Sequence, residues 1–289
     1  MGDAEPARLE SEVMARREQA VVENAPGELF VDSSCIECDT CRELAPDLFG
    51  GDGQSFVSRQ PLGEAQWQRA LQAVVSCPTA SIGAERSARE AARSLPVHLG
   101  GPVFRCGYSS EVSYGAQSYF LQRDDGNVLV DSPRFAASLA LRLEALGGVR
   151  RLFLTHQDDV ADHAAFRARF GCERIIHRED DRIGAEISLD GPGEIGRGLR
   201  VIPVPGHTRG SCALLVDEKY LFTGDHLWAE EGRLAMGRDV CWYSWAEQKK
   251  SLRKLLDFSF EWVLPGHGRS LQLEPAAMRA EIEALCRRT

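Results

Sequence analysis

The sequence lacks a long apolar run and an excess of positive charge. Residues 1–20 alternate Glu and Arg with small apolar residues, so they contain no apolar core of the kind found in a signal peptide or a membrane span. The 34 Lys and Arg are outnumbered by 43 Asp and Glu, and the net charge of −9 disfavours nucleic acid as a partner. We therefore expect a cytoplasmic protein that binds neither nucleic acid nor a membrane.

The overall composition is that of a folded globular protein. Hydrophobic residues make up 43% and charged residues 27% of the 289 positions, which are ordinary fractions. A chain of this length suits one large or two ordinary domains. The nine cysteines are many for a cytoplasmic chain, and the spacing explains four of them.

These four cysteines have the spacing of an iron-sulfur site. Cys35, Cys38 and Cys41 form a C-x-x-C-x-x-C triad, and Cys77 follows much later in a Cys-Pro pair. This pattern is typical of a cubane [4Fe-4S] cluster, because the tight loop wraps one corner and the remote thiolate closes the opposite side. Zinc ribbons normally carry two separate C-x-x-C pairs, and disulfides are disfavoured in the cytoplasm. The segment resembles single-cluster ferredoxins, in which the fourth ligand also precedes a proline.

Short elements around these cysteines predict a small domain. Residues 28–32 and 55–58 have the composition of strands, and residues 64–75 have the spacing of an amphipathic helix. A unit this small would depend on its cluster for stability. We place a ferredoxin-like domain with an N-terminal helical extension at residues 1–83, a helical linker at 84–96 and a second domain at 97–289.

Four motifs in the second domain place His or Asp directly after a short apolar segment. The first, residues 154–163, reads Leu-Thr-His-Gln-Asp-Asp-Val-Ala-Asp-His and follows a predicted buried strand. The others are Pro-Gly-His-Thr at 205–208, Phe-Thr-Gly-Asp-His at 222–226 and Pro-Gly-His-Gly at 265–268. One such turn alone is compatible with a helix cap. Four of them indicate a shared site for zinc, iron or manganese, which imidazole and carboxylate together suit.

This set of motifs resembles the metallo-β-lactamase superfamily, and especially its glyoxalase II-like branch, over about the last two thirds of the chain. The resemblance implies an αββα sandwich with a dinuclear metal site at one edge, so we expect an α+β protein. It also implies two sets of metal ligands. By position, His156, Asp158 and His207 would hold one metal, Asp162, His163 and His267 would hold the other, and Asp225 would bridge them.

The first motif departs from the family pattern in two ways. The family usually has His where Asp158 stands, and it usually has three residues, not five, between the first His and the Asp-His pair. A gapless alignment would put two apolar residues on ligand positions, so we expect a bulged loop that presents Asp162 and His163. Whether Asp158 or Asp159 is the ligand stays open.

The two cofactor sites together allow two kinds of reaction. With zinc, the dinuclear site would activate water and polarise a carbonyl for hydrolysis of a thioester, ester or lactone. With iron, it would reduce dioxygen, nitric oxide or another acceptor with electrons from the cluster. A cluster adds nothing to hydrolysis, and the carboxylate of Asp158 favours iron or manganese over zinc. The sequence therefore favours a diiron oxidoreductase, with the hydrolase as the alternative and a structural or redox-sensing cluster as a third interpretation.

The expected partners follow from these reactions. The substrate is a small molecule in either case. The oxidoreductase would also need a redox partner or reductase, and a homodimer contact if the two sites within one chain are too far apart.

Several other residues have less specific signals. Asp162, Asp225 and His226 are expected to be catalytic, by orienting water, bridging the metals and facing the substrate or supporting the metals. The aromatic segment 241–245 is interpreted as core, with a substrate wall as the alternative. Five cysteines without a spacing partner are expected to be small buried apolar residues: Cys106, Cys172, Cys212, Cys241 and Cys286.

Overall fold

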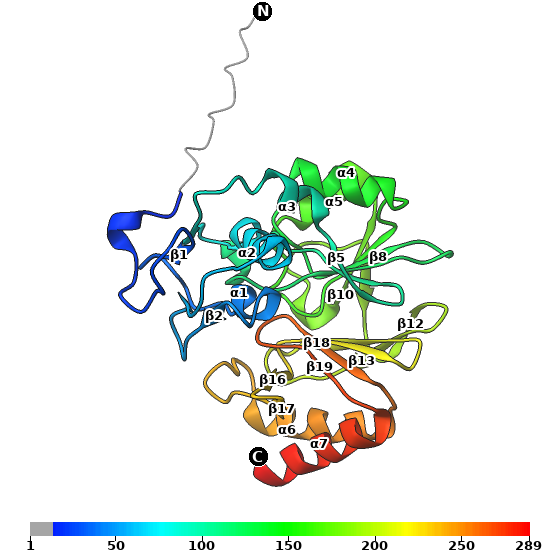
Figure 1. Ribbon diagram of the computed structural model, residues 1–289. Helices are drawn as coiled ribbons and strands as arrows, with labels where there is room; N and C mark the ends of the chain where they lie inside the picture. Colours follow the sequence, from blue (N-terminus) through cyan, green and yellow to red (C-terminus); the bar gives the residue numbers. More distant parts are fainter. Residues whose placement is uncertain (1–13) are drawn as a thin grey trace, which may run out of the picture.

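The structure, a computed structural model, describes residues 14–289 as a small N-terminal unit packed against a four-layer unit (Figure 1). Residues 1–13 of the predicted N-terminal extension lie outside the described residues. Among the helices of residues 14–289, none is both long and apolar enough to cross a membrane.

The N-terminal unit consists of two pairs of very short strands and two helices. After a 3-10 turn (Arg17–Gln19) come β1 (Phe30–Val31), α1 (Thr40–Leu44), β2 (Phe49–Gly50), β3 (Phe56–Val57), α2 (Glu64–Ser76) and β4 (Ile82–Gly83). β1 pairs with β4 and β2 with β3, both antiparallel. Helix α2 confirms the predicted helix: Trp67 and Leu71 pack in the core of this unit. Because α2 ends at Ser76, it delivers Cys77 to the cysteine triad.

The predicted linker contains α3 (Arg89–Ser94), and this segment packs against both units. Ala91 belongs to the hydrophobic core of the N-terminal unit, whereas Leu95 is buried under the helices of the C-terminal unit. The segment between the units is therefore a packed helix with buried residues at both ends.

The first sheet of the C-terminal unit has seven strands in the order β11-β10-β9-β8-β7-β6-β5. In chain order they are β5 (Val97–Gly100), β6 (Val103–Arg105), β7 (Tyr119–Leu121), β8 (Val128–Val130), β9 (Arg151–Phe153), β10 (Glu173–His177) and β11 (Ile187–Leu189). Strands β5 to β8 are antiparallel neighbours, and β8 to β11 are parallel. The helices α4 (Ala137–Ala145) and α5 (His163–Phe170) make the crossovers that parallel strands require.

The second sheet has six strands in the order β12-β13-β14-β15-β18-β19. They are β12 (Gly193–Gly196), β13 (Leu199–Pro203), β14 (Cys212–Val216), β15 (Tyr220–Gly224), β18 (Trp262–Pro265) and β19 (Leu271–Gln272). A small hairpin, β16 (Trp228–Glu230) with β17 (Arg233–Ala235), and helix α6 (Trp245–Lys254) connect the parallel neighbours β15 and β18. Helix α7 (Pro275–Arg288) follows β19.

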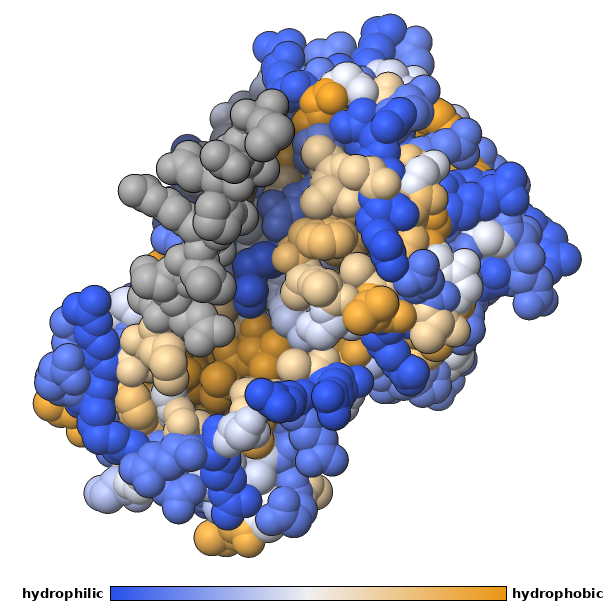
Figure 2. All heavy atoms as spheres, turned by 90° about the horizontal axis from the view of Figure 1, so that it is seen from above, coloured by the Kyte–Doolittle hydropathy of each residue, from blue (hydrophilic) through white to orange (hydrophobic). Residues whose placement is uncertain are grey.

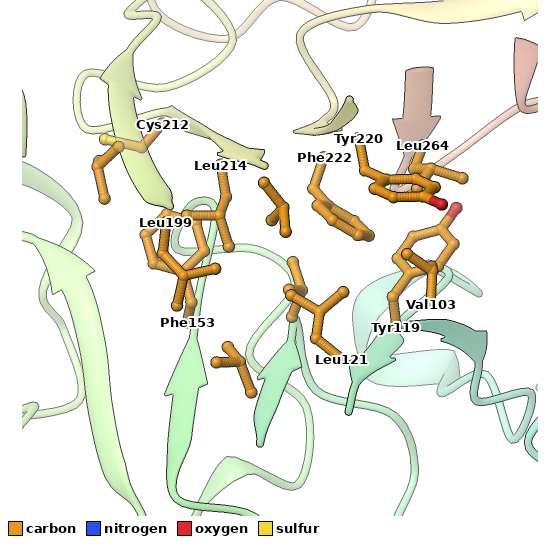
Figure 3. Packing of buried hydrophobic residues seen from close by; sticks show 14 of the residues in the cluster. Val103, Tyr119, Leu121, Phe153, Leu199, Cys212, Leu214, Tyr220, Phe222 and Leu264 are labelled. Carbon is orange, nitrogen blue, oxygen red and sulfur yellow. The ribbon is translucent and has the colours of Figure 1, made fainter. Parts of the chain in front are cut away.

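The two sheets pack face to face and enclose the main core (Figure 3). Inward side chains of both sheets meet there, and Tyr119 of β7 contacts Phe222 of β15 edge to face at 5.2 Å between ring centroids. Helices α4 and α5 cover the outer face of the first sheet, and α6 and α7 cover that of the second. The predicted αββα sandwich is thereby confirmed, because each sheet buries its second face under helices.

Candidate metal centre

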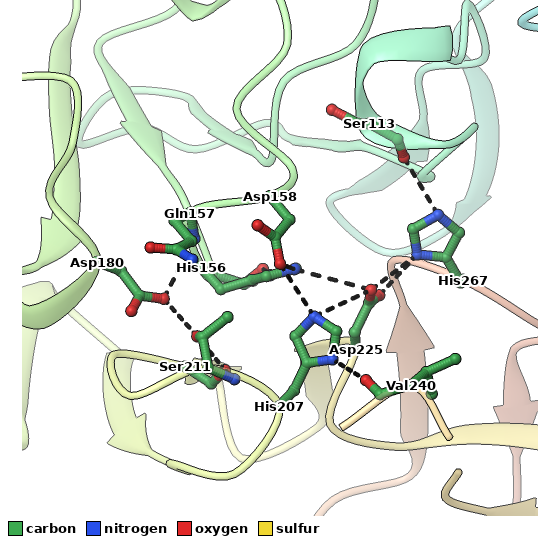
Figure 4. A network of polar contacts seen from close by, with 12 residues as sticks. Ser113, His156, Gln157, Asp158, Asp180, His207, Ser211, Asp225, Val240 and His267 are labelled. Atoms are coloured by element: carbon green, nitrogen blue, oxygen red, sulfur yellow. Dashed lines mark hydrogen bonds and ion pairs between the residues drawn. The ribbon is translucent and has the colours of Figure 1, made fainter. Parts of the chain in front are cut away.

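The four motif loops meet at one edge of the sandwich (Figure 4). They follow β9, β13, β15 and β18, which bring their carboxyl ends to the same edge. Ligand atoms of His156, His207 and Asp225 lie within 4.8 Å of one another, and those of Asp159, Asp225 and His267 do the same. Asp225 belongs to both groups, which is the position of a bridging carboxylate.

The first group brings its ligand atoms close enough together to share one metal ion. His207 Nε2 lies 3.3 Å from Asp158 Oδ2 and 3.6 Å from Asp225 Oδ2. His156 Nε2 lies 3.8 and 3.7 Å from the same two oxygens. The two imidazole rings stand edge to face, 4.7 Å apart, so both Nε2 atoms point toward the carboxylates.

The second group is packed so closely that it requires a glycine beside it. His267 Nδ1 lies 2.8 and 3.0 Å from the two oxygens of Asp225. A Cβ at Gly266 would come within 2.6 Å of Asp159 Oδ2 and 2.8 Å of Asp225 Oδ1. Gly266 therefore allows the two carboxylates to approach the backbone.

Four buried ligand atoms have no hydrogen-bond partner within the described residues. They are His156 Nε2, His207 Nε2 and both carboxylate oxygens of Asp159. Buried polar atoms without a partner are costly and rare. Two metal ions would supply the missing partners, and nitrogen and carboxylate ligands suit such ions. The residues therefore fit a dinuclear metal site.

Neighbouring groups orient the two imidazoles of the first group. Thr155 Oγ1 lies 3.0 Å from both oxygens of Asp131 and 3.0 Å from His156 Nδ1. His207 Nδ1 lies 2.6 Å from the Val240 carbonyl oxygen, to which it donates. Such contacts to the second nitrogen fix the ring and leave Nε2 free for a metal.

A buried aspartate that the sequence analysis missed ties two motif loops together. Asp180 accepts hydrogen bonds from the Thr208 hydroxyl, from Gly210 N at 2.8 Å and from Gln157 N at 3.2 Å. Asp131 was missed as well, although it follows an apolar strand just as the ligands do. Asp180 offers no such signal in the sequence, since it follows β10 only after a turn.

The charges in the centre are distributed unevenly. Burial lowers the pKa of His156 to about 4. Burial acts in the same direction on His267, but the Asp225 carboxylate outweighs it and raises the pKa of His267 to about 10. Burial also works against ionised Asp225, yet His267 and its neighbours hold the pKa of this carboxyl well below its usual range. These shifts favour charge on His267 and Asp225, which lie 2.8 Å apart, over charge on His156.

The structure does not bring Asp162 and His163 to this centre, so the predicted bulged loop is wrong. Asp162 Oδ2 accepts a hydrogen bond from Phe135 N at 2.7 Å, and His163 begins α5 with its Nδ1 3.0 Å from Arg174 Nη1. The loop needs no bulge because consecutive aspartates serve both groups: half-exposed Asp158 faces the first and buried Asp159 the second.

Of the two roles expected for His226, facing the substrate does not fit the structure, and supporting the metals stays a prediction. Its side chain is fully buried, does not line the cavity beside the metal centre, and has no hydrogen-bond partner at either ring nitrogen among the described residues. Burial lowers its pKa to about 3. A neutral ring that does not reach the cavity is not placed to touch a substrate.

The four predicted cluster ligands line one small cavity. Cys35, Cys38, Cys41 and Cys77 surround it, and none of them forms a disulfide. Burial raises the pKa of Cys38 to about 11, so thiolates at this position need a nearby cation. Ser81 N donates to Cys77 Sγ at 3.3 Å, a contact suited to a charged sulfur. These residues fit an iron-sulfur cluster.

A cavity of about 590 Å³ joins the two regions, because residues of both line it. The N-terminal unit contributes Cys38 and its neighbours, and the metal centre contributes both carboxylates of the first motif loop. The lining residues of the two regions are Glu37, Cys38, Asp39, Arg42, Asp158, Asp159, His207, Asp225 and His267.

Helix α1 makes the direct contact between the regions. The Thr40 hydroxyl donates to the Gly115 carbonyl oxygen at 3.0 Å. A Cβ at Gly115, whose φ is +86°, would lie 2.3 Å from Cys38 Cβ. Two residues earlier, the Ser113 carbonyl oxygen lies 3.2 Å from His267 Nε2. One short segment thus touches a cysteine of the triad and a histidine of the second group.

Comparisons with known proteins cover both units. Residues 31–84 match the family model described as the 4Fe-4S single cluster domain of Ferredoxin I. Hydroxyacylglutathione hydrolase of Anaeromyxobacter dehalogenans (strain 2CP-C) is 37% identical over 193 residues, which cover 59% of this chain and 74% of that protein. The enzyme of the same name from Rhizobium etli is 32% identical over 178 residues, covering 54% and 67%.

A solved structure and a second family model agree on the C-terminal unit. A metallo-beta-lactamase from Hirschia baltica, 18% identical, covers 66% of this chain and 96% of its own with a TM-score of 0.50. This likeness shows a shared fold. Residues 106–284 match the family model of the metallo-beta-lactamase superfamily. The chain therefore belongs to the metallo-beta-lactamase superfamily, with a 4Fe-4S single-cluster ferredoxin domain preceding the metallo-beta-lactamase unit.

Proposed function

We propose that this metalloenzyme is a hydrolase that cleaves a thioester or ester. The observation that carries the proposal is the group of unpartnered ligand atoms around Asp225, at a cavity large enough for a small organic molecule. The relatives named hydroxyacylglutathione hydrolase support it. They favour the hydrolase over the oxidoreductase that the sequence motifs favoured.

The residues of the centre fall into two sets, one for each proposed metal ion. His156, Asp158 and His207 would hold one metal, Asp159 and His267 the other, and Asp225 both. Bound divalent metals lower the pKa of water to about 7 and polarise a carbonyl, which is what hydrolysis at neutral pH requires. Three carboxylates offset three of the four charges of two divalent ions.

Residues that hydrogen-bond to the proposed ligands and their loops hold the ligands in position. Asp131 holds Thr155, which holds His156, and the Val240 carbonyl holds His207. Asp180 ties the loop of Gln157 to that of Thr208. Because Asp131, Thr155 and Asp180 are buried and the Val240 carbonyl is in hydrogen-bond contact with His207, the ligand nitrogens are oriented before a substrate enters, which lowers the cost of reaching the reactive geometry.

A second candidate function is electron transfer to a redox-active metal centre. The specific observation in its favour is that Cys38 lines the same cavity as Asp158 and His267. A cluster at Cys38 would therefore border the substrate site. This reaction would need iron or manganese in the centre and an external reductase, which hydrolysis does not.

Metal analysis combined with turnover tests the proposal. Protein purified without oxygen is analysed for iron, zinc, manganese and acid-labile sulfide, and thioester cleavage is measured with the cluster oxidised and reduced. We expect cleavage without any electron acceptor, at a rate that does not change when the cluster is reduced. Cluster absorbance that bleaches with a reductant and returns with an acceptor, without thioester cleavage, would establish the oxidoreductase instead.

A further inference from the structure

We propose that the substrate of the metal centre carries a neutral apolar arm, an aryl or medium-length alkyl group, which binds between Tyr114 and Trp242 at the mouth of the cavity. This inference rests on the proposed hydrolase function and names its substrate class.

Exposed apolar side chains gather at this cavity. On the face in Figure 2, hydrophilic residues predominate and apolar residues form patches between them. Among residues 14–289, nine large hydrophobic side chains are exposed, and four of the nine line the cavity: Val112, Tyr114, Val240 and Trp242. Such a concentration at one concave site marks a binding surface, because isolated exposed apolar residues would be scattered.

Trp242 is exposed although its backbone is firmly held. Trp242 N and Tyr243 N both donate to the His207 carbonyl oxygen at 3.0 Å, and Ser244 N donates to the Gly206 carbonyl oxygen at 2.9 Å. The indole ring lies 6.1 Å from the His207 ring and is 67% exposed. The loop therefore presents a fixed apolar surface beside a metal ligand.

Tyr114 lies beside His267 of the second group, in a strained conformation. Its φ of 49° and ψ of 27° place a bulky residue in the left-handed region, which such residues rarely adopt. Hydrogen bonds from Tyr114 N to the Glu111 carbonyl and from Gly115 N to the Ser110 carbonyl hold the turn. The ring lies 6.3 Å from the His267 ring and is 60% exposed. Backbone strain that presents an exposed ring serves binding rather than core packing.

The charges of the cavity disfavour a negatively charged arm. Glu37 and Asp39 of the N-terminal unit face the cavity, and the Arg42 guanidinium that also lines it is paired with Asp39. An anionic arm would therefore meet carboxylates without an unpaired cation from this wall. A neutral apolar arm gains from both aromatic rings and loses nothing to these charges.

Thioesters of one neutral thiol test the inference. Acetyl, hexanoyl and phenylacetyl thioesters of N-acetylcysteamine are compared on the metal-loaded full chain. We expect kcat/KM for phenylacetyl to exceed that for acetyl by about tenfold or more. Trp242→Ala and Tyr114→Ala should abolish most of this ratio, whereas Trp242→Phe should retain it. Leu141→Ala is the matched control, since Leu141 is 61% exposed but lies on α4 and does not line the cavity.

The outcomes separate this inference from the proposed function. Equal kcat/KM for the three thioesters, or the same loss of the ratio in Leu141→Ala, overturns the apolar arm and leaves the hydrolase in place. If the wild type cleaves no thioester or ester, the hydrolase proposal fails. Calorimetric binding of phenylacetate and of acetate then tests the apolar arm by itself. Tighter binding of phenylacetate that is lost in Trp242→Ala supports the apolar arm, and equal affinity overturns it.

Discussion

The cysteine site and the metal centre are built in opposite ways. Three of the four cysteines come from one seven-residue segment that runs into α1, and α2 brings the fourth. The ligands of the metal centre come from four loops that follow strands in two different sheets. A local site can be identified from spacing, because residues separated by a few positions must lie close together in space. A nonlocal site depends on which side chains each loop turns inward, and there the sequence analysis erred.

The largest expected effect comes from removing the one residue that both halves of the metal centre share. Asp225→Asn should remove bound metal and lower turnover by about a thousandfold or more, because both ions lose a ligand. Cluster absorbance and sulfide content should not change, since the cysteine site has its own core. Asp257→Asn, at an exposed position, is the control. Retention of both metals in Asp225→Asn would contradict the bridging position.

Separate substitutions of Asp159 and Asp162 test which of these two aspartates belongs to the second group. Asp159→Asn should weaken binding of the second metal by about 10- to 100-fold. Asp162→Asn should keep both metals and lower the free energy of unfolding by about 1 kcal/mol, because it weakens the hydrogen bond from Phe135 N. Metal content by mass spectrometry and urea unfolding distinguish them. The reverse pattern would restore the bulged loop predicted from the sequence.

Substitution of Gly115, at the contact between the cysteine site and the metal centre, tests whether these two sites are independent. Gly115→Ala would force a Cβ against Cys38 and move the segment whose Ser113 carbonyl contacts His267. We expect lower iron and sulfide content together with about tenfold weaker binding of the second metal. Gly232→Ala is the matched control, since Gly232 also has a positive φ but no atom within 4 Å of the added Cβ. Equal effects of both variants would show that backbone strain alone is responsible.

The smallest effect on the centre should come from breaking the ion pair between Glu186 and Arg174, the arginine that contacts His163. Hydrogen bonds from Arg174 hold the pKa of Glu186 well below its usual value of 4.5. The stabilisation is therefore fully present above about pH 4.5 and is lost as the pH falls toward the folded-state pKa. Glu186→Gln should lower the free energy of unfolding by about 2 kcal/mol at pH 7, and by less at pH 4. Unfolding in urea at both pH values measures this, and metal content at pH 7 should stay unchanged.

The aromatic segment 241–245 is a second place where the prediction from the sequence and the structure differ. Trp242 and Tyr243 were interpreted as core because apolar residues usually are, and this interpretation is wrong: both are exposed. Helix α6 starts at Trp245, and no local pattern in the sequence indicates that the preceding loop is hydrogen-bonded to the His207 carbonyl. Cys106, Cys172 and Cys212 are buried as expected, whereas Cys241 and Cys286 are only partly buried.

From the sequence alone, motifs and the family resemblance predicted the cysteine site, the sandwich fold and five residues that the structure brings together at the centre: His156, Asp158 (with Asp159 as the open alternative), His207, Asp225 and His267. Each of the five metal-site residues stands in a short motif directly after an apolar segment, and the resemblance to the family then implied its place in the site. Only the tertiary structure showed that Asp159 lies in the second group while Asp162 and His163 lie elsewhere, that Asp131 and Asp180 hold the motif loops, and that Cys38 and the metal-site residues line one cavity. Those outcomes depend on contacts between segments far apart in the chain, which no local pattern encodes.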